Sequence, residues 1–267
     1  MDWWLLSYPL LGIFAGFIAG LFGVGGGLTL VPILFMLFKA QGFPAEHVMH
    51  LALGTSMATI VFTSISSMRA HHKHGAVRWD IVATLAPGLV LGTFGGSLLS
   101  GLVPTRPLVM VFTVIVYYAS AQMMLDFKPK PHRQLPGRVA LFLVGTGIGI
   151  VSSLVAAGGG FLSIPFMLFC NVAIHQAVGT SSALGFPIAL AGMIGYILAG
   201  GDDQGLPSGH LGYIYLPALV GIVAMSVLVA PLGAKLAHKL PVKQLKRAFG
   251  GFLALLATKM LHSLLTS

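Results

Sequence analysis

Charged residues are scarce in this chain of 267 residues, where Asp, Glu, Lys and Arg together make up only 8%. Soluble domains carry about 25%, and a surface that faces water cannot be built from so few charges. Because 56% of the residues are hydrophobic, we expect a lipid bilayer to cover the molecule. The excess of 15 Lys and Arg over 6 Asp and Glu mainly sets orientation in a membrane protein. It therefore gives no reason to expect a nucleic-acid partner.

Cysteine and intramembrane carboxylates are also lacking. The single cysteine, Cys170, excludes a disulfide or a cysteine metal cluster within the chain. All six carboxylates fall in loops or at the ends of apolar segments: Asp2, Glu46, Asp80, Asp126, Asp202 and Asp203. Carboxylates inside membranes commonly relay protons or bind cations, and hydrolases usually need a paired acid and base. We therefore expect no carboxylate-driven pump, no enzyme, no cofactor and no metal site.

Long apolar runs dominate what is present. A spanning helix needs about 20 apolar residues, and six segments fit: 48–68, 81–101, 107–125, 177–199, 212–234 and 247–265. Two further runs, 5–38 and 139–170, are too long for one crossing, and each carries a glycine triplet followed by Pro32 or Pro165. Glycine runs favour a break, and proline is tolerated in the first turn of a helix. We predict a helix, a break and a shorter helix in each run.

The basic residues indicate whether the broken runs cross the membrane or turn back. If both runs cross once, Lys and Arg divide almost evenly between the two sides. If both turn back, most of them fall on one side, as is typical of short cytoplasmic loops. The second arrangement places 69–80, 126–138 and 235–246 in the cytoplasm and both termini outside. We therefore favour two hairpins that turn back.

The chain also repeats itself. Residues 16–32 (GFIAGLFGVGGGLTLVP) align with 149–165 (GIVSSLVAAGGGFLSIP), and the later block HLALGTS, from His50 to Ser56, aligns with HQAVGTS, from His175 to Ser181. Three crossings after the first hairpin start the second copy from the opposite face, so that the repeat is inverted.

This pattern predicts an all-α, polytopic transmembrane bundle of two inverted repeats, each with a glycine-broken hairpin and three spanning helices. The expected divisions are 1–127 for the first repeat, 128–138 for a cytoplasmic linker and 139–267 for the second repeat. Inverted repeats with interrupted helices are the architecture of many secondary transporters, whose substrate site lies where the breaks meet.

The paired motifs resemble those of the sulfite exporter TauE/SafE family. G-x(6)-G-x-G-G-G-x(4)-P runs from Gly16 to Pro32, and A-x-G-T-S runs from Ala52 to Ser56. The resemblance covers nearly the whole chain and implies a membrane permease, with many members linked to export of sulfite, sulfonates or other sulfur-containing anions. The second copy departs from the first: Ser152, Ser153 and Ala156 replace Ala19, Gly20 and Gly23. The two halves of a site therefore need not be equivalent.

The breaks suit an anion. They expose backbone N–H groups beside helix starts with a positive dipole end, and nearby hydroxyls add donors. The candidate substrate-binding residues are Gly25, Gly26, Gly27, Thr55, Ser56, Gly158, Gly159, Gly160, Thr180 and Ser181. The alternative is that the glycines only allow tight packing. We assign that role to the rows spaced by four residues: Gly12, Gly16 and Gly20, and Gly88, Gly92 and Gly96.

The histidines allow two interpretations. His50 and His175 precede the Gly-Thr-Ser blocks and could donate to the anion or carry a proton. Alternatively, they hydrogen-bond backbone groups at a membrane edge. The run from His71 to His74 could bind a transition metal, although a solvated basic loop is the simpler interpretation.

The sequence therefore predicts a multi-pass protein of a bacterial inner (plasma) membrane. The leading hypothesis is a secondary carrier that exports a small sulfur-containing or organic anion, such as sulfite or a sulfonate. A metal-ion permease and an anion channel are the alternatives. The lipid bilayer and the small anion are the expected partners, and the motifs carry no information on the oligomeric state.

Overall fold

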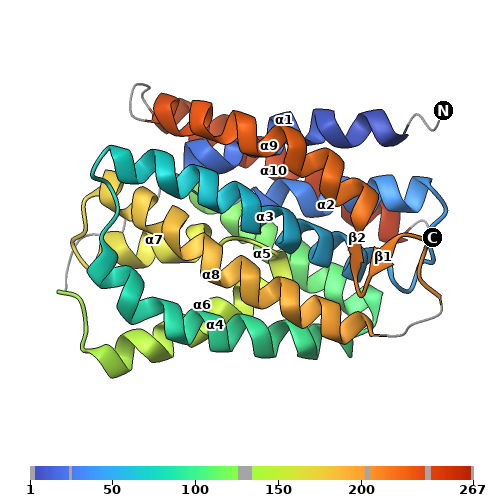
Figure 1. The fold of residues 1–267 in the computed structure, drawn as a ribbon, viewed down its shortest axis with the longest axis horizontal. Coiled ribbons are helices and arrows are strands. Elements are labelled where there is room, and N and C mark those ends of the chain that lie inside the picture. The colour runs from blue at the N-terminus through green and yellow to red at the C-terminus, as the bar shows by residue number, and fades with distance from the viewer. Residues whose placement is uncertain (1–3, 24–25, 126–133, 202–204, 238–241, 266–267) are drawn as a thin grey trace.

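The computed structural model describes residues 4–23, 26–125, 134–201, 205–237 and 242–265, which form a bundle of ten α-helices and one small β-hairpin (Figure 1). The helices of the first half are α1 (Trp4–Phe22), α2 (Gly27–Ala40), α3 (Val48–Lys73), α4 (Trp79–Gly101) and α5 (Thr105–Met124). Those of the second half are α6 (Arg138–Val155), α7 (Gly160–Phe169), α8 (Ile174–Gly200), α9 (Leu216–Ala237) and α10 (Val242–Leu265). The predicted all-α, polytopic fold class is confirmed.

Six of the described helices are long and apolar enough to cross a membrane, namely α3, α4, α5, α6, α8 and α9. They cover five of the six predicted spans, and α10 covers the sixth. One boundary differs from the prediction, because α9 begins at Leu216 and not at residue 212. Strands β1 (His210–Leu211) and β2 (Ile214–Tyr215) pair antiparallel there. Gly209 and Gly212, with φ of 84° and 54°, allow the turns that this hairpin needs.

Both long apolar runs are broken, as predicted. The run 5–38 divides into α1 and α2, and the run 139–170 divides into α6 and α7. The later helices begin at the third glycine of each triplet, so Pro32 and Pro165 lie in their second turns and not in their first. Each proline then leaves the carbonyl four residues earlier without its helical N–H partner.

Each broken run turns back to the end of the bundle where it began. The Tyr8 hydroxyl, near the start of α1, donates to Oε1 of Gln41, just past the end of α2 (3.0 Å). In the second half, the N–H of Arg78 before α4 donates to Oγ1 of Thr180 near the start of α8 (3.0 Å). Because α4 runs parallel to α6, helices α6 and α8 begin at the same end, and α7 returns to it.

The glycine rows pair each half with the other. The row in α1 lies against α9 at Ile222, Ser226 and Ala230, and the row in α4 lies against α6 at Phe142, Thr146 and Ile150. Residue numbers rise together along both pairs, so the paired helices are parallel. A Cβ added at these glycines would collide with the facing helix, which confirms the packing role predicted for the rows.

Helices α3 and α8 cross the centre in opposite directions. Gly192 faces Met57, Gly185 faces Ser64, and the Ser67 and Ser182 hydroxyl oxygens lie 3.4 Å apart. These helices are corresponding elements of the aligned halves, and the α1–α9 contact corresponds to the α6–α4 contact. The contacts support an inverted repeat, which stays a prediction together with the divisions at residues 127 and 138.

The two ends of the bundle differ in charge. Helix α1 begins and α10 ends at the right of Figure 1, which we call the terminal end. The α3–α4 connection and the start of α6 lie at the left, which we call the basic end because it carries Arg69, Lys73, Arg78, Arg138 and Lys235. The basic end is the one predicted to face the cytoplasm.

Candidate functional site

The two glycine breaks have nearly the same backbone conformation. Gly26 and Gly159, which precede α2 and α7, have φ and ψ of 79° and −10° and of 75° and −10°. Gly23 and Ala156, which occupy the corresponding earlier position of each break, also have positive φ, of 65° and 44°. Glycine adopts this left-handed conformation freely, whereas alanine is strained in it. Each break is therefore built from two left-handed residues that separate one helix from the next.

The breaks touch each other in the interior. Gly27, the first residue of α2, lies so close to the carbonyl of Ala156 that a Cβ at Gly27 would overlap its oxygen. Gly26, Gly27 and the stretch 156–160 are all buried. The structure thus brings Gly27 against Ala156, two residues before the second glycine triplet, while Gly25 lies outside the described residues.

Helix α2 starts at this contact, and α7 starts four residues after Ala156. Their N-caps are glycines, so no side chain caps either helix. The first N–H groups of a helix have no partner within it, and the same end carries partial positive charge. Both helix starts are buried, so each of them favours a negatively charged group nearby.

Buried hydroxyls lie beside the breaks. Ser163 of α7 donates to Ser181 of α8 (3.1 Å), and Ser181 donates to the carbonyl of Gly23 (3.0 Å). The Oγ atoms of Ser152 and of Ser56, which is one turn before Ile60 on α3, are buried and have no hydrogen-bond partner among the described residues. Ser152 Oγ would lie 3.8 Å from a Cβ at Gly159. A buried hydroxyl without a partner costs free energy, so these two groups are available to a ligand.

The hydroxyls of Thr55 and Thr180 already have backbone partners. Thr55 Oγ1 accepts the N–H of Tyr215, directly before α9 (3.0 Å). Thr180 Oγ1 accepts the N–H of Arg78, directly before α4 (3.0 Å). Each threonine therefore fixes the start of a helix, in addition to the substrate contact that the sequence predicts for it.

The two aligned histidines have different surroundings. His50 is buried, its Nε2 lies 3.1 Å and 3.0 Å from the carbonyl oxygens of Ser100 and Val103, and its ring stacks on Tyr213 with the centroids 4.9 Å apart. His175 is exposed at the start of α8. The contacts of His50 correspond to the structural interpretation, a histidine hydrogen-bonded to backbone near the end of a span.

The histidine run before α4 does not converge on one point. His71 is buried, with its Nε2 3.2 Å from the carbonyl oxygen of Gly20. His72 accepts the indole N–H of Trp79 at its Nδ1 (3.3 Å). In the part of the chain that the structure describes, no group of three or more His, Cys, Asp or Glu residues could hold a metal ion.

Comparison with known proteins assigns the chain to a family. Residues 8–260 match the sequence profile of the family described as Sulfite exporter TauE/SafE. The chain belongs to this family. A Haemophilus influenzae relative, named "Probable membrane transporter protein", is 40% identical over 258 residues, which are 96% of this chain and 97% of the relative. No solved structure matches the chain.

Two more distant relatives of this TauE/SafE chain carry similar names. The Bacillus subtilis protein named "Probable membrane transporter protein YdhB" is 30% identical over 252 residues, 91% of this chain and 93% of the relative. A Methanocaldococcus jannaschii protein, also named a probable membrane transporter protein, is 27% identical over 267 residues, 96% of each chain. The chain is therefore a multi-pass membrane transporter and not an enzyme.

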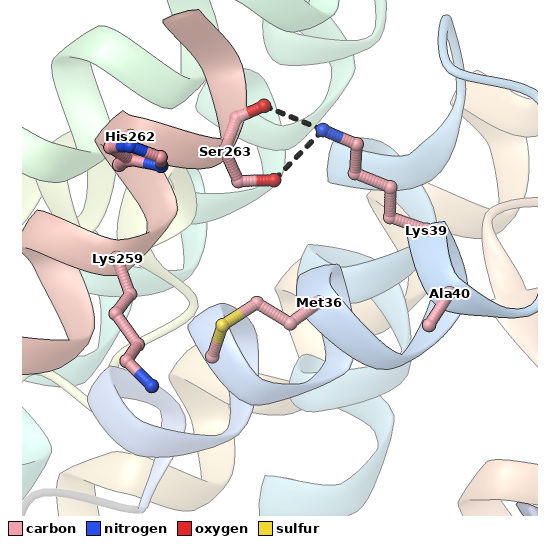
Figure 2. Close-up of a pocket in the computed structure, with 6 residues that line it drawn as sticks. All are labelled: Met36, Lys39, Ala40, Lys259, His262 and Ser263. Carbon is pink, nitrogen blue, oxygen red and sulfur yellow. Dashed lines mark hydrogen bonds between the residues drawn. The ribbon is translucent and has the colours of Figure 1, made fainter. Parts of the chain in front are cut away.

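One surface pocket of this TauE/SafE transporter lies at the terminal end, away from the breaks (Figure 2). It measures about 540 Å³ and is lined by Met36, Lys39, Ala40, Lys259, His262 and Ser263. The ammonium group of Lys39 donates to the backbone oxygen and hydroxyl of Ser263 (2.5 Å and 2.8 Å). Since Ser263 is near the end of α10, Lys39 satisfies a terminal carbonyl and ties α2 to α10.

Two serines beside the breaks were not among the residues that the sequence predicts for the site. Ser152 was noted only as a departure between the two copies, and Ser163 lies at an aligned position where the first copy has Leu30. Hydroxyls within otherwise apolar helices, at positions aligned with a break, were the available signal. Their proximity to the breaks could be learned only from the fold.

Proposed function

We propose that this transporter is a secondary carrier that exports a small sulfur-containing or organic anion, such as sulfite or a sulfonate, and binds it between the two glycine breaks. The observation that supports the proposal is the contact between Gly27 and Ala156, which joins the uncapped start of α2 to the other break, four residues before the uncapped start of α7. Half-helices whose N-termini point at anionic substrate groups are a recurring device of transporters with broken helices.

Hydrogen bonds and helix dipoles provide the recognition in this proposal. A lysine or arginine buried at mid-membrane is expensive, whereas N–H and hydroxyl donors stabilise an oxyanion without that cost. The proposed site consists of the break glycines, with Ser56 and Ser152 as additional donors. Ser181 already covers the carbonyl of Gly23, which reduces repulsion between that oxygen and an anion.

Burial of the breaks supports a carrier mechanism. The break residues are enclosed in the described conformation, so the anion needs a rearrangement of the hairpins to enter or leave. Rocking of one repeat against the other around a fixed site is the usual solution in such proteins. A permanently open channel would instead leave the breaks exposed to water.

Counterflow in liposomes tests the proposal. Purified protein would be reconstituted with sulfite, thiosulfate, sulfoacetate, taurine or a simple carboxylate inside, and uptake of a labelled anion would be followed. We expect saturable uptake for sulfur oxyanions or organic anions, and none in liposomes without protein. Currents that never saturate would establish a channel instead, and exchange of metal cations alone would reject anion binding at the breaks.

A further inference from the structure

A second cavity, a groove of about 450 Å³, opens between α3 and α9 at the basic end. Its apolar wall includes Phe62, Ile65, Val227 and Pro231. Cationic side chains line it closer to the end of the bundle, where Arg69 and Lys73 follow on α3 and Lys235 follows on α9. His74, directly after α3, also lines it. Phe62 and Lys73 lie about 16 Å apart along the axis of α3, at 1.5 Å per residue. The groove therefore has an apolar inner part and a basic opening at the end of the bundle.

The groove and the breaks lie on different faces of α3. Ile60 and His71 face the breaks, because Ile60 would contact a Cβ at Gly27 (3.0 Å) and His71 contacts the carbonyl of Gly20. Residues 62, 66, 69 and 73 recur at helical spacing on another face, where Ser66 donates to the carbonyl of Val227 on α9 (2.8 Å). A molecule in the groove would not touch the proposed substrate site.

Arg69, Lys73 and Lys235 have no carboxylate partner among the described residues. All three side chains are exposed. Asp80, the described carboxylate at this end, is paired with Arg78 (2.6 Å). Helix dipoles favour Lys73 and Lys235, which lie in last turns. The helix dipoles do not explain why Arg69 lies one turn earlier, or why basic residues from both α3 and α9 line the same end of the groove.

The aligned helix pair of the other half shows that packing does not require these charges. Thr55 with Tyr215 and Thr180 with Arg78 fix the register of the two halves, and α8 packs along α4 as α3 packs along α9. In this register Ile194, Leu198 and Leu98 replace Arg69, Lys73 and Lys235. The side chains of Ile194 and Leu198 are 42% and 59% exposed. The α4–α8 pair is therefore apolar at the terminal end, whereas the corresponding α3–α9 pair is cationic at the basic end.

We propose that the α3–α9 groove binds an anionic phospholipid from the leaflet at the basic end. Its phosphate lies between Arg69, Lys73 and Lys235, and one acyl chain follows the apolar wall. Basic pockets between transmembrane helices bind acidic headgroups by this combination of charge and apolar contact. The proposal is independent of the transported substrate, because the groove faces away from the breaks.

Native mass spectrometry of the delipidated full-length protein tests the proposal. The protein would be titrated with phosphatidylglycerol and, separately, with phosphatidylcholine carrying the same acyl chains. We expect one tightly bound phosphatidylglycerol and much weaker phosphatidylcholine. R69Q/K73Q should weaken phosphatidylglycerol about tenfold or more, since each basic residue contributes appreciably to binding of an acidic lipid. The matched control, R138Q/R247Q, removes two exposed arginines from α6 and α10 and should change the affinity less than about twofold.

A second variant separates lipid binding from charge and folding. Val227→Trp fills the apolar wall without changing any charge, and it should displace phosphatidylglycerol while the thermal unfolding of the protein stays normal. Equal losses in both double variants, equal binding of phosphatidylcholine, or full lipid affinity in Val227→Trp would each overturn the proposal. So would a raised half-saturating anion concentration in R69Q/K73Q with intact lipid binding, which would assign the groove to the transport path.

Discussion

The break between α1 and α2 and the break between α6 and α7 share a backbone but not their side chains. Gly26 and Gly159 differ by 4° in φ, taken as 79° minus 75°, and not at all in ψ. The position of Gly23 in the first break is taken by Ala156 in the second, and both are left-handed. The helices before the breaks differ more, because Ser152 and Ser153 stand where the first half has Ala19 and Gly20.

This difference separates what the fold requires from what a ligand requires. Two left-handed residues and a helix starting at a glycine occur in both halves, so they belong to the common architecture. The unpartnered hydroxyl of Ser152 occurs in the second half alone, and Ser56, which also lacks a partner, is aligned with Ser181, which has two. The polar lining of the proposed site is therefore asymmetric although its backbone is nearly symmetric.

The largest effect is expected where the two breaks touch. Gly27→Ala would put a methyl group into the carbonyl of Ala156 and against Ile60, and overpacking of this kind costs about 1–3 kcal/mol. We expect counterflow to fall about tenfold or more, with protein still present in the membrane fraction. Gly147→Ala is the matched control, because no atom lies within 4 Å of its added Cβ. Wild-type transport in Gly27→Ala would show that the contact is dispensable.

Exchanging the residues at the first left-handed position sharpens the comparison. Gly23→Ala introduces strain at φ 65° and brings a Cβ to 2.7 Å from the carbonyl oxygen of Val178. It should destabilise the protein by about 1–3 kcal/mol. Ala156→Gly relieves the strain at φ 44° and should stabilise it by up to about 1 kcal/mol. Thermal unfolding in detergent measures both, and shifts of the same sign would mean that the two breaks are not built alike.

The spans and breaks could be predicted because they depend on local properties. About 20 apolar residues suffice for a crossing, and glycine triplets interrupt a helix wherever they occur. The span 212–234 that the sequence predicts includes part of the β-hairpin before α9, since Tyr213 and Ile214 continue an apolar run. The geometry of the hairpin depends on two left-handed glycines and on the N–H of Tyr213 donating to the carbonyl of Tyr196 (3.1 Å).

The surroundings of the breaks depend on tertiary contacts that no local pattern encodes. The meeting of Gly27 with Ala156 joins residues from different halves. One contact occurs at the same aligned positions in both halves but is made by different side chains. In the first half His71 lies against the carbonyl of Gly20, and in the second half Tyr196 donates to the carbonyl of Ser153 (2.9 Å). Aligning the sequences of the two halves pairs His71 with Tyr196, but it does not reveal that both side chains contact a carbonyl at the same aligned position.

Ser56 and Ser181 offer a comparison of function against stability. Ser181→Ala removes the donor to the carbonyl of Gly23 and should lower stability by about 1–2 kcal/mol, or about 2–6 °C in the unfolding midpoint. Ser56→Ala removes a buried hydroxyl without a described partner and should leave the midpoint unchanged or raise it slightly. If Ser56 binds the anion, its loss should raise the half-saturating concentration about fivefold. Unchanged affinity in Ser56→Ala would exclude Ser56 from the site.

The smallest effect on transport is expected at Thr55 and Thr180, where the two halves agree most closely. Each hydroxyl oxygen accepts the N–H of the residue before a helix, both at 3.0 Å. Thr55→Val and Thr180→Val keep the shape and remove the acceptor, so each should lower stability by about 1 kcal/mol. Because both N–H groups belong to the frame around the breaks, the half-saturating concentration should change less than about twofold. A fivefold rise with an unchanged unfolding midpoint would restore the substrate contact that the sequence predicts, and unequal losses of stability would break the equivalence of the two halves.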